Sequence, residues 1–335
     1  MDGLPEVTDA GSLGVFHLKR YWARQATARA GQSGNAATEW DQDRTLLYGL
    51  GLGLRETLQY LLHSAPSLEE FERWILDRNE GRIDAARLAR LNAALGGHDA
   101  RDEEVERAPD VLTTEDLALW EERGYVVLHD AVSPENCRAT ERAVWESIDA
   151  DPADSATWYR GPQGPSIWVP ALHHPALRAN RQALRIRKAF AQVWRRSDIW
   201  ITVDFGGFNP PETESWKFPG PYLHWDVSVE PPVPFGVQGI LYLSDTAPDQ
   251  GAFRCVPGFH RKLNGWLKSL PPGANPREQD LEALGPVAIT GRAGDLIIWR
   301  HELPHGSSPN RAAKPRIVQY ISAEPSRCEA NPVWK

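Results

Sequence analysis

The sequence predicts an α+β protein in two parts, a helical N-terminal region over residues 1–108 and a β-rich domain over residues 109–335. In the first part, apolar residues recur at the period of an amphipathic helix. From Ile199 onward, short β-branched and aromatic runs alternate with glycine, proline and aspartate, which is typical of a β-sandwich or barrel. Residues 97–110 are polar and strongly charged, and they mark the expected boundary.

Three helices are expected in the first part. Residues 53–64 place leucines on one face at helical spacing, and a second helix follows Ser67, which is spaced to form a capping box with Glu70. A third helix begins after Asp84 and ends at Gly96, which we expect in the left-handed conformation of a C-cap. No motif here indicates catalysis, so covering the second domain, dimerisation and docking of a carrier all stay open as roles.

The second part opens with helical and extended signals in alternation. Thr113 is placed to cap a helix that ends at Gly124, and residues 125–129 (YVVLH) follow as a strand. Ser133 then precedes a proline, the residue favoured at the first position of a helix. Four later runs are predicted strands, at residues 199–205, 237–245, 295–300 and 316–322.

Composition limits the possible partners. The 335 residues carry a formal charge of −8, which disfavours nucleic acid and anionic membranes and leaves a small-molecule substrate as the expected partner. No apolar run is long enough to cross a bilayer, and the first residues do not resemble a secretory signal. The three cysteines are widely spaced, which favours a reduced, cytoplasmic setting. A homodimer is compatible with these features.

The triplet His224-Trp225-Asp226 is the first pattern that indicates chemistry. On a strand, residues two apart point to the same side, so the imidazole and the carboxylate would converge. His301 and His305, which follow a predicted strand, are both candidates for a third ligand. Two histidines and one carboxylate on one face of an iron ion leave positions open for 2-oxoglutarate and dioxygen.

Arg316 supports this interpretation. It follows His305 by eleven residues and begins an apolar strand, so a hairpin of that length can return it to the metal. Its planar guanidinium is suited to bind the distal carboxylate of 2-oxoglutarate in a bidentate pair. The alternative is an ion pair at the surface. An arginine that begins an apolar strand needs a buried anion, which favours the first interpretation.

Residues 112–325 resemble the phytanoyl-CoA dioxygenase family of iron- and 2-oxoglutarate-dependent oxygenases. Four segments carry the resemblance, in the family's order: LTTEDLALWEERGYVVLHDAVSPE, HWD, GAFRCVPGFHR and GDLIIWRHELPHGSSPN followed by Arg316. Two departures are present. Phe259 replaces the usual serine of the third segment, and Gly207-Phe208-Asn209-Pro210 stands where relatives often carry an Asn-x-Lys-Pro segment. No co-substrate contact is therefore assigned to residues 207–210.

The resemblance implies a double-stranded β-helix of the jelly-roll, cupin-like type with flanking helices. It also implies iron ligation by His224, Asp226 and His305, with 2-oxoglutarate bound by Arg316 and Ser307. Gln238 is expected on a strand that lines the cavity, where it could bond the co-substrate or the substrate. Related halogenases replace the carboxylate ligand by a small residue, so the presence of Asp226 favours hydroxylation.

The substrate is predicted less closely. Aromatic residues in or near loops are candidates for contacts with it, and packing alone is the alternative explanation of each. The acidic balance and these aromatics favour a polar natural product of secondary metabolism, such as an aminocyclitol or aminosugar antibiotic compound. An acyl-CoA or amino-acid hydroxylase, a non-catalytic binding protein of the same fold and a barrel protein that uses another metal without 2-oxoglutarate are the alternatives. The candidate aromatics are Trp158, Trp168, Trp216, Tyr222 and Trp225.

Overall fold

The computed structural model describes residues 3–31, 39–160 and 166–328. The chain divides into two compact units, which are described separately. Unit 1 is formed by residues 1–108, 194–203 and 323–328, and unit 2 by the rest. The two later segments of unit 1 were not expected from the sequence.

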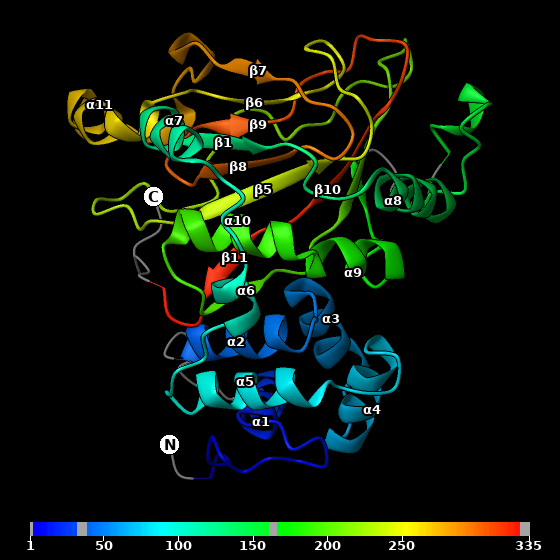
Figure 1. Ribbon diagram of the computed structural model, residues 1–335, viewed down its shortest axis with the longest axis vertical. Helices are drawn as coiled ribbons and strands as arrows, with labels where there is room; N and C mark the ends of the chain where they lie inside the picture. The colour runs from blue at the N-terminus through cyan, green and yellow to red at the C-terminus, as the bar shows by residue number, and fades with distance from the viewer. Residues whose placement is uncertain (1–2, 32–38, 161–165, 329–335) are drawn as a thin grey trace. The chain divides into compact units, whose positions relative to one another are not determined.

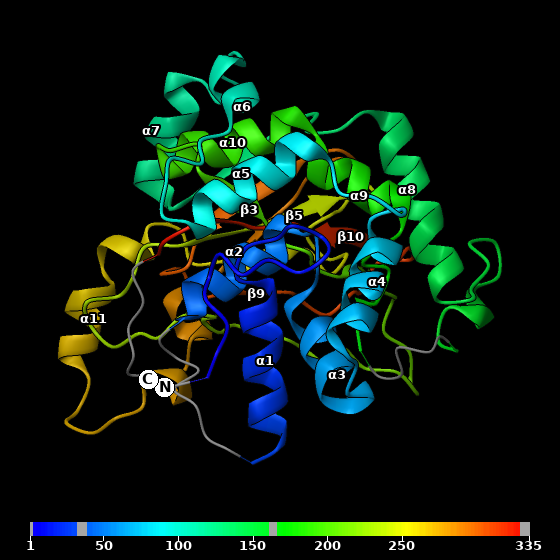
Figure 2. The ribbon, with the colours of Figure 1, turned by 90° about the horizontal axis from the view of Figure 1, so that it is seen from below.

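Unit 1 is a helical bundle with a small apolar core. Its core includes Leu46, Leu50, Phe71, Ile75 and Leu91, all completely buried. Helices α3 and α4 run side by side (Figure 2), and the Tyr60 and Trp74 rings stack between them with centroids 4.7 Å apart. The helices are α1 (Leu18–Arg29), α2 (Trp40–Gly49), α3 (Leu54–Ser64), α4 (Leu68–Arg78), α5 (Ala85–Leu95) and α6 (Glu103–Arg107).

The three predicted helices of this unit are confirmed, with one error at a helix end. Ser67 and Glu70 form the reciprocal capping box of α4, and the Asp84 side chain caps α5. The prediction for Gly96 is wrong, because its φ is −78°. The left-handed conformation belongs to Gly97, at φ +79°, one residue beyond the C-cap Gly96.

A two-stranded antiparallel sheet completes unit 1. It pairs β3 (Ile199–Ile201) with β11 (Ala323–Pro325). Trp200 joins the apolar core, and its indole N–H donates to Ser326 Oγ at 2.8 Å. Strand β3 covers only the first three residues of the run predicted at 199–205.

Unit 2 contains two antiparallel sheets (Figure 1). The small sheet has the order β7 (Val287–Ile289), β6 (Phe253–Cys255) and β9 (His305–Gly306). The large sheet has the order β1 (Tyr125–Leu128), β8 (Leu296–Arg300), β5 (Val237–Tyr242), β10 (Arg316–Tyr320), β4 (Gly206–Asn209) and β2 (Trp168–Val169).

The core of unit 2 lies between these sheets. Tyr242, Ile297 and Val318 of the large sheet join Phe253 and Cys255 of the small sheet in one apolar cluster. Because side chains alternate along a strand, the inner face of β10 carries Arg316, Val318 and Tyr320.

Two helices cover the other face of the large sheet, and three more belong to the described part of unit 2 (Figure 1). Gln319 points outward from β10 and donates to the carbonyl oxygen of Leu177 at 2.8 Å. The covering helices are α9 (Pro175–Gln182) and α10 (Leu184–Trp194). The others are α7 (Thr114–Arg123), α8 (Pro134–Ser147) and the short α11 (Leu263–Ser269).

The predicted fold class is confirmed: unit 2 is an α+β domain with a jelly-roll core and flanking helices. Thr113 caps α7, and Gly124 ends it at φ +78°, as expected. Ser133 caps α8, with proline at its first position. Among the described residues, no helix has both the length and the apolar character that crossing a membrane requires.

Candidate functional site

The His224–Asp226 segment enters the site through a single bridge and not through a full strand. His224 and His305 exchange both backbone hydrogen bonds, with N···O distances of 2.9 and 3.0 Å. The chain then bends at Asp226, so the strand predicted for this triplet is wrong. The bridge nevertheless fixes the two histidines side by side, because directly bridged residues of antiparallel chains are close neighbours.

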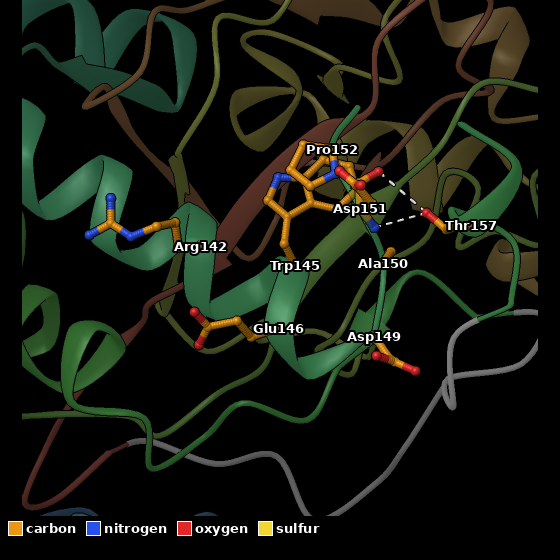
Figure 3. A pocket seen from close by; sticks show the side chains of 8 residues that line it. All are labelled: Arg142, Trp145, Glu146, Asp149, Ala150, Asp151, Pro152 and Thr157. Atoms are coloured by element: carbon orange, nitrogen blue, oxygen red, sulfur yellow. Dashed lines mark hydrogen bonds between the residues drawn. The ribbon is translucent and has the colours of Figure 1, made fainter. Parts of the chain in front are cut away.

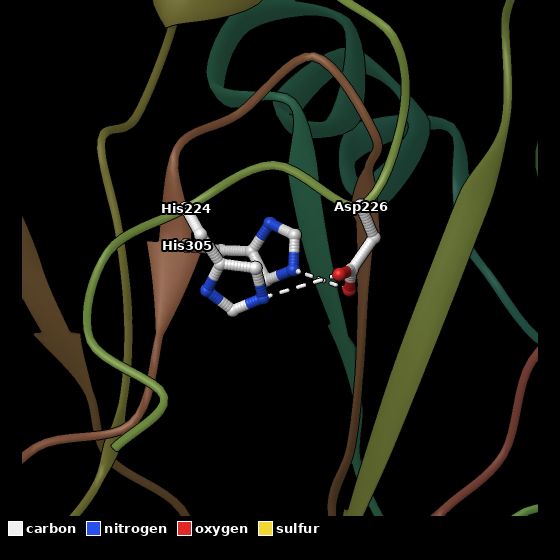
Figure 4. Close-up of side chains that lie close together, drawn as sticks. All are labelled: His224, Asp226 and His305. Carbon is white, nitrogen blue, oxygen red and sulfur yellow. Dashed lines mark hydrogen bonds and ion pairs between the residues drawn. The ribbon is translucent and has the colours of Figure 1, made fainter. Parts of the chain in front are cut away.

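Three side chains converge at this bridge (Figure 4). His224 Nε2 lies 3.3 Å from Asp226 Oδ1, and His305 Nε2 lies 3.4 Å from Asp226 Oδ2. One ligand atom from each residue lies within 4.8 Å of the other two, which suits a single metal ion. His305 is almost completely buried, whereas the Asp226 side chain is 47 % exposed, so the cluster has a closed side and an open side.

The second nitrogen of each imidazole is held by backbone. His224 Nδ1 lies 2.6 Å from the carbonyl oxygen of Tyr222, and His305 Nδ1 lies 3.0 Å from that of Leu303. A carbonyl oxygen only accepts, so each Nδ1 carries a proton. A metal ion that displaces the Nε2 protons facing Asp226 would therefore meet both rings in the tautomer that it needs.

The electrostatics keep the Asp226 carboxyl ionised. Packing around the group raises its pKa, but hydrogen bonds from His224 and His305 outweigh this and hold the pKa well below its usual range. For His224, burial lowers the pKa, but the hydrogen bond and the attraction to the Asp226 carboxylate outweigh this, so the pKa is raised above its usual value. A carboxylate between two imidazoles is a donor set that accepts a divalent transition metal.

Arg316 and Ser307 form a second part of the site. Arg316 is completely buried at the start of β10, and its Nη1 donates to Ser307 Oγ at 2.9 Å. Ser307 lies two residues after His305, which brings the guanidinium to the same end of the small sheet as the histidines. Arg316 Nη2 also lies 3.5 Å from the Tyr320 hydroxyl. Within the described part of the chain, its bonding partners are hydroxyl groups, and its Nε has none.

Gln238 contacts Asp226, a partner that the sequence did not suggest.

 Its amide nitrogen Nε2 lies 2.8 Å from Asp226 Oδ2. An ionised carboxylate only accepts hydrogen bonds, so the nitrogen of the amide must face it. The other end, Oε1, is buried and has no partner among the described residues.

A comparison with known protein families shows to which family the chain belongs. The model of the phytanoyl-CoA dioxygenase family matches residues 120–318, which is more than half of the sequence. The chain belongs to the phytanoyl-CoA dioxygenase family. This is a family of iron- and 2-oxoglutarate-dependent oxygenases, which confirms the predicted family, enzyme class and cofactors.

Two curated proteins are similar to this family member. A candidate phytanoyl-CoA dioxygenase of Dictyostelium discoideum is 23 % identical over 260 residues, covering 62 % of this chain and 74 % of its own. The ectoine dioxygenase of Sphingopyxis alaskensis is 25 % identical over 260 residues. The match covers 72 % of this chain and 82 % of the ectoine dioxygenase.

Solved structures similar to this chain include EctD from S. alaskensis with bound Fe, which has 22 % sequence identity and a TM-score of 0.49. That likeness covers 67 % of this chain and 81 % of EctD. A second is EvdO2 from Micromonospora carbonacea var. aurantiaca complexed with 2-oxoglutarate, at 16 % identity and a TM-score of 0.47. It covers 68 % of this chain and 96 % of EvdO2.

The five aromatic candidates separate into two groups. Trp225 is 2 % exposed and packs into the core against Phe259, with its indole N–H on the carbonyl oxygen of Glu302. Trp158 is 9 % exposed and packs against Trp145. Packing explains both residues, because neither leaves an open ring face for a substrate.

The other three aromatics are more open. Trp168 is 37 % exposed, and its ring centroid lies 4.6 Å from that of Tyr320, the neighbour of Arg316. Tyr222 is 55 % exposed, and its carbonyl oxygen bonds to His224. Trp216 is half-buried beside Tyr159, with ring centroids 6.2 Å apart. Trp168 and Tyr222 are thus linked by direct contacts to the two parts of the site.

Sequence reasoning missed Arg277 and Tyr320. Arg277 Nη1 donates to the carbonyl oxygen of Trp225 at 2.5 Å, and its Nη2 donates to that of Val227 at 2.6 Å. No motif marks Arg277. Tyr320, in contrast, could have been found, because it lies four residues after Arg316 on the same face of a predicted strand.

An open cavity of about 610 Å³ lies elsewhere in unit 2, at the end of α8 (Figure 3). Glu146, Asp149 and Asp151 line it with Trp145, and none of the predicted site residues does. The Thr157 hydroxyl lies 2.8 Å from the Asp151 backbone nitrogen, which donates to it. These carboxylates are exposed to solvent, so their presence needs no ligand to explain it.

Proposed function

We propose that the chain is an iron- and 2-oxoglutarate-dependent hydroxylase of a small polar molecule. His224, Asp226 and His305 would hold the iron, and Arg316 with Ser307 would bind the distal carboxylate of 2-oxoglutarate. The observation that carries the proposal is the completely buried Arg316, which has hydroxyl partners and lies beside a metal-binding cluster.

The buried charge supports a dicarboxylate as the co-substrate. Removing a guanidinium from water costs several kcal/mol unless an anion compensates it. The hydroxyls of Ser307 and Tyr320 carry no formal charge, so they satisfy hydrogen bonds without neutralising Arg316. A carboxylate that reaches this pocket would supply the missing charge, and the planar fork of arginine suits it.

The chain's own residues would then hold and orient the reacting groups. Iron and 2-oxoglutarate, when bound, would supply the electrons that activate dioxygen for hydroxylation. Asp226 stays ionised and fills the carboxylate position of the ligand set, which supports hydroxylation over halogenation. Its exposed side leaves room beside the cluster for a substrate.

The free end of Gln238 supports a substrate that carries a hydroxyl or an amine. One N–H of its amide donates to Asp226, which leaves the second N–H and the unpartnered, buried acceptor Oε1. The carboxylate and keto oxygens of 2-oxoglutarate are acceptors as well, and they could not bond it. Of the two roles that the sequence left open for Gln238, Oε1 therefore favours a contact with a donor of the substrate, and the second N–H remains available to the co-substrate.

A polar ring compound fits these contacts better than an acyl chain. The exposed rings of Trp168 and Tyr222 would pack against the apolar face of a sugar or cyclitol. The net charge of −8 favours a cationic compound, such as an aminocyclitol or aminosugar. The similarity to an ectoine dioxygenase, named for a small solute, is in keeping with this choice.

The test has two stages. Anaerobic titration of the protein with Fe(II) and 2-oxoglutarate should produce the visible charge-transfer band of their complex. In air, succinate formation should then be stimulated by one member of a panel containing 2-deoxystreptamine, glucosamine, ectoine, proline and palmitoyl-CoA. Absence of both the band and succinate would contradict the oxygenase assignment, and stimulation by palmitoyl-CoA alone would contradict the substrate class.

A further inference from the structure

We propose that Arg277 is a positioning residue that fixes Asp226 in the orientation needed to hold the metal. It would act through the backbone on both sides of Asp226, without touching the metal or the substrate. The inference rests on the proposed function, because it takes Asp226 as a metal ligand.

The need for such a residue follows from the bend after His224. Alternate residues of an antiparallel strand bond to the same neighbour, so the carbonyl groups of residues 225 and 227 face away from the segment that pairs with His224. The structure has one bridge at His224 and a bend at Asp226, so the ladder does not continue. Backbone carbonyls away from water require donors, and those of Trp225 and Val227 must find them elsewhere.

Arg277 supplies both donors from one rigid group. Its Nη1 lies 2.5 Å from the carbonyl oxygen of Trp225, and its Nη2 lies 2.6 Å from that of Val227. These are the residues immediately before and after Asp226. Because the guanidinium is planar, the two bonds fix the relative orientation of the peptide groups that flank the ligand.

Arg277 is itself held in place. It lies in a short 3-10 helix, η4 (Pro276–Glu278), and its backbone nitrogen donates to the Asn275 side chain at 3.0 Å. Pro276 is buried and has a restricted φ, which anchors the turn. The side chain of Arg277 is therefore anchored at its backbone, and it holds a segment that lies fifty residues earlier in the sequence.

The Asp226 carboxylate is held from its other side by Gln238. Arg277 thus restrains the backbone of the ligand and Gln238 its side chain. Lysine could not replace Arg277 fully, because an ammonium has no planar fork and is a compact point charge. A leucine side chain at either position would leave Asp226 free to turn away from the histidines.

The experiment compares three variants of the full-length protein. Arg277→Met should weaken Fe(II) binding about tenfold or more, since loss of groups that orient a ligand typically costs that much. Arg277→Lys should lie between this variant and the wild type. Arg185→Met is the matched control, because Arg185 also donates to two backbone carbonyls, those of Asp130 and His129, at 3.1 Å each.

Iron affinity is measured anaerobically by the charge-transfer band at saturating 2-oxoglutarate, and thermal unfolding of the metal-free proteins is recorded beside it. The expected result is a loss of iron affinity in Arg277→Met with 2-oxoglutarate affinity at saturating iron unchanged, and no loss in Arg185→Met. Wild-type iron affinity in Arg277→Met, or an equal loss in the control, would overturn the proposal. If Arg277→Met does not fold, the lysine variant decides by the same criterion.

Failure of this proposal differs from failure of the proposed function. A wild-type protein that forms no band with Fe(II) and 2-oxoglutarate would contradict the function itself. A normal wild-type band that the Arg277 variants leave unchanged would contradict the positioning role alone.

Discussion

The two units of this protein bury charge in opposite ways. In unit 1, the completely buried His17 has its Nε2 2.8 Å from Asp43 Oδ1. Arg24 contacts the same Asp43 carboxylate and lies 3.4 Å from Glu39, which also pairs with Arg20. The cationic side chains of this network therefore meet carboxylates of the same unit.

In unit 2, Arg316 is equally buried but meets hydroxyl groups. A network that neutralises itself needs no ligand and serves the stability of the fold. A buried cation with uncharged partners is costly in the ligand-free protein, which supports the proposal that Arg316 binds an anionic ligand. The contrast separates structural charge from functional charge, and mutation of each should affect a different measurement.

The largest effect is expected for Arg316→Met. Loss of the charge partner should weaken 2-oxoglutarate binding by about 3 kcal/mol, which is about 150-fold, as for truncation of one member of a buried charge pair. Thermal stability without 2-oxoglutarate should stay equal or rise, because an uncompensated buried charge is removed. Titration of the charge-transfer band measures the first effect, and a thermal melt the second. A marked loss of thermal stability with normal 2-oxoglutarate binding would show that Arg316 stabilises the fold and does not bind the co-substrate.

Arg24→Met is the counterpart in unit 1. It leaves Asp43 and the neighbouring Glu39 with less positive charge, so the free energy of unfolding should fall by about 2 kcal/mol. This lies below the cost for fully buried pairs, because Arg24 keeps 10 % of its surface exposed. Urea unfolding measures the change. Binding of 2-oxoglutarate should not change, and an equally large effect on it would remove the distinction between the two units.

The sequence predicted those parts of the site whose positions follow from regular structure. Arg316 begins a predicted strand eleven residues after His305, so spacing could relate these two, whereas Ser307 was assigned by the family resemblance. The resemblance already chose His305 over His301, and in the structure the ring of His301 lies over Gly236, outside the cluster of His224, Asp226 and His305. Sequence spacing could therefore predict the position of a site residue only where the backbone is regular.

Features that depend on irregular backbone could not be read from the sequence. The bend at Asp226 replaces ladder bonds by side-chain bonds, and no local pattern identifies Arg277 as their donor. The pairing of β3 with β11 joins residues more than a hundred positions apart through strands of three residues each. Strands this short give too little alternation to identify a pairing partner.

Ser307→Ala should produce a smaller loss at the same pocket as Arg316. The substitution removes the hydroxyl that accepts from Arg316 Nη1 at 2.9 Å but keeps the guanidinium charge. Affinity for 2-oxoglutarate should fall by about 1.5 kcal/mol, or about tenfold, which is typical of a hydrogen bond to a charged group. The same titration measures it, with Ser269→Ala on α11 as the matched serine control. An effect as large as that of Arg316→Met would mean that orientation, and not charge, dominates binding.

The smallest effect is expected for Ser67→Ala at the start of α4. The Ser67 hydroxyl accepts from the Glu70 backbone nitrogen at 3.2 Å, and the Glu70 side chain accepts from the Ser67 backbone nitrogen at 2.7 Å. Loss of this cap should lower the free energy of unfolding by about 1 kcal/mol, whereas Ser67→Gly should retain most of it. Urea unfolding of both variants tests this order. Because the cap belongs to unit 1 and carries no buried charge, neither variant should alter 2-oxoglutarate affinity, and a shift in that affinity would show that the stability of unit 1 controls the site in unit 2.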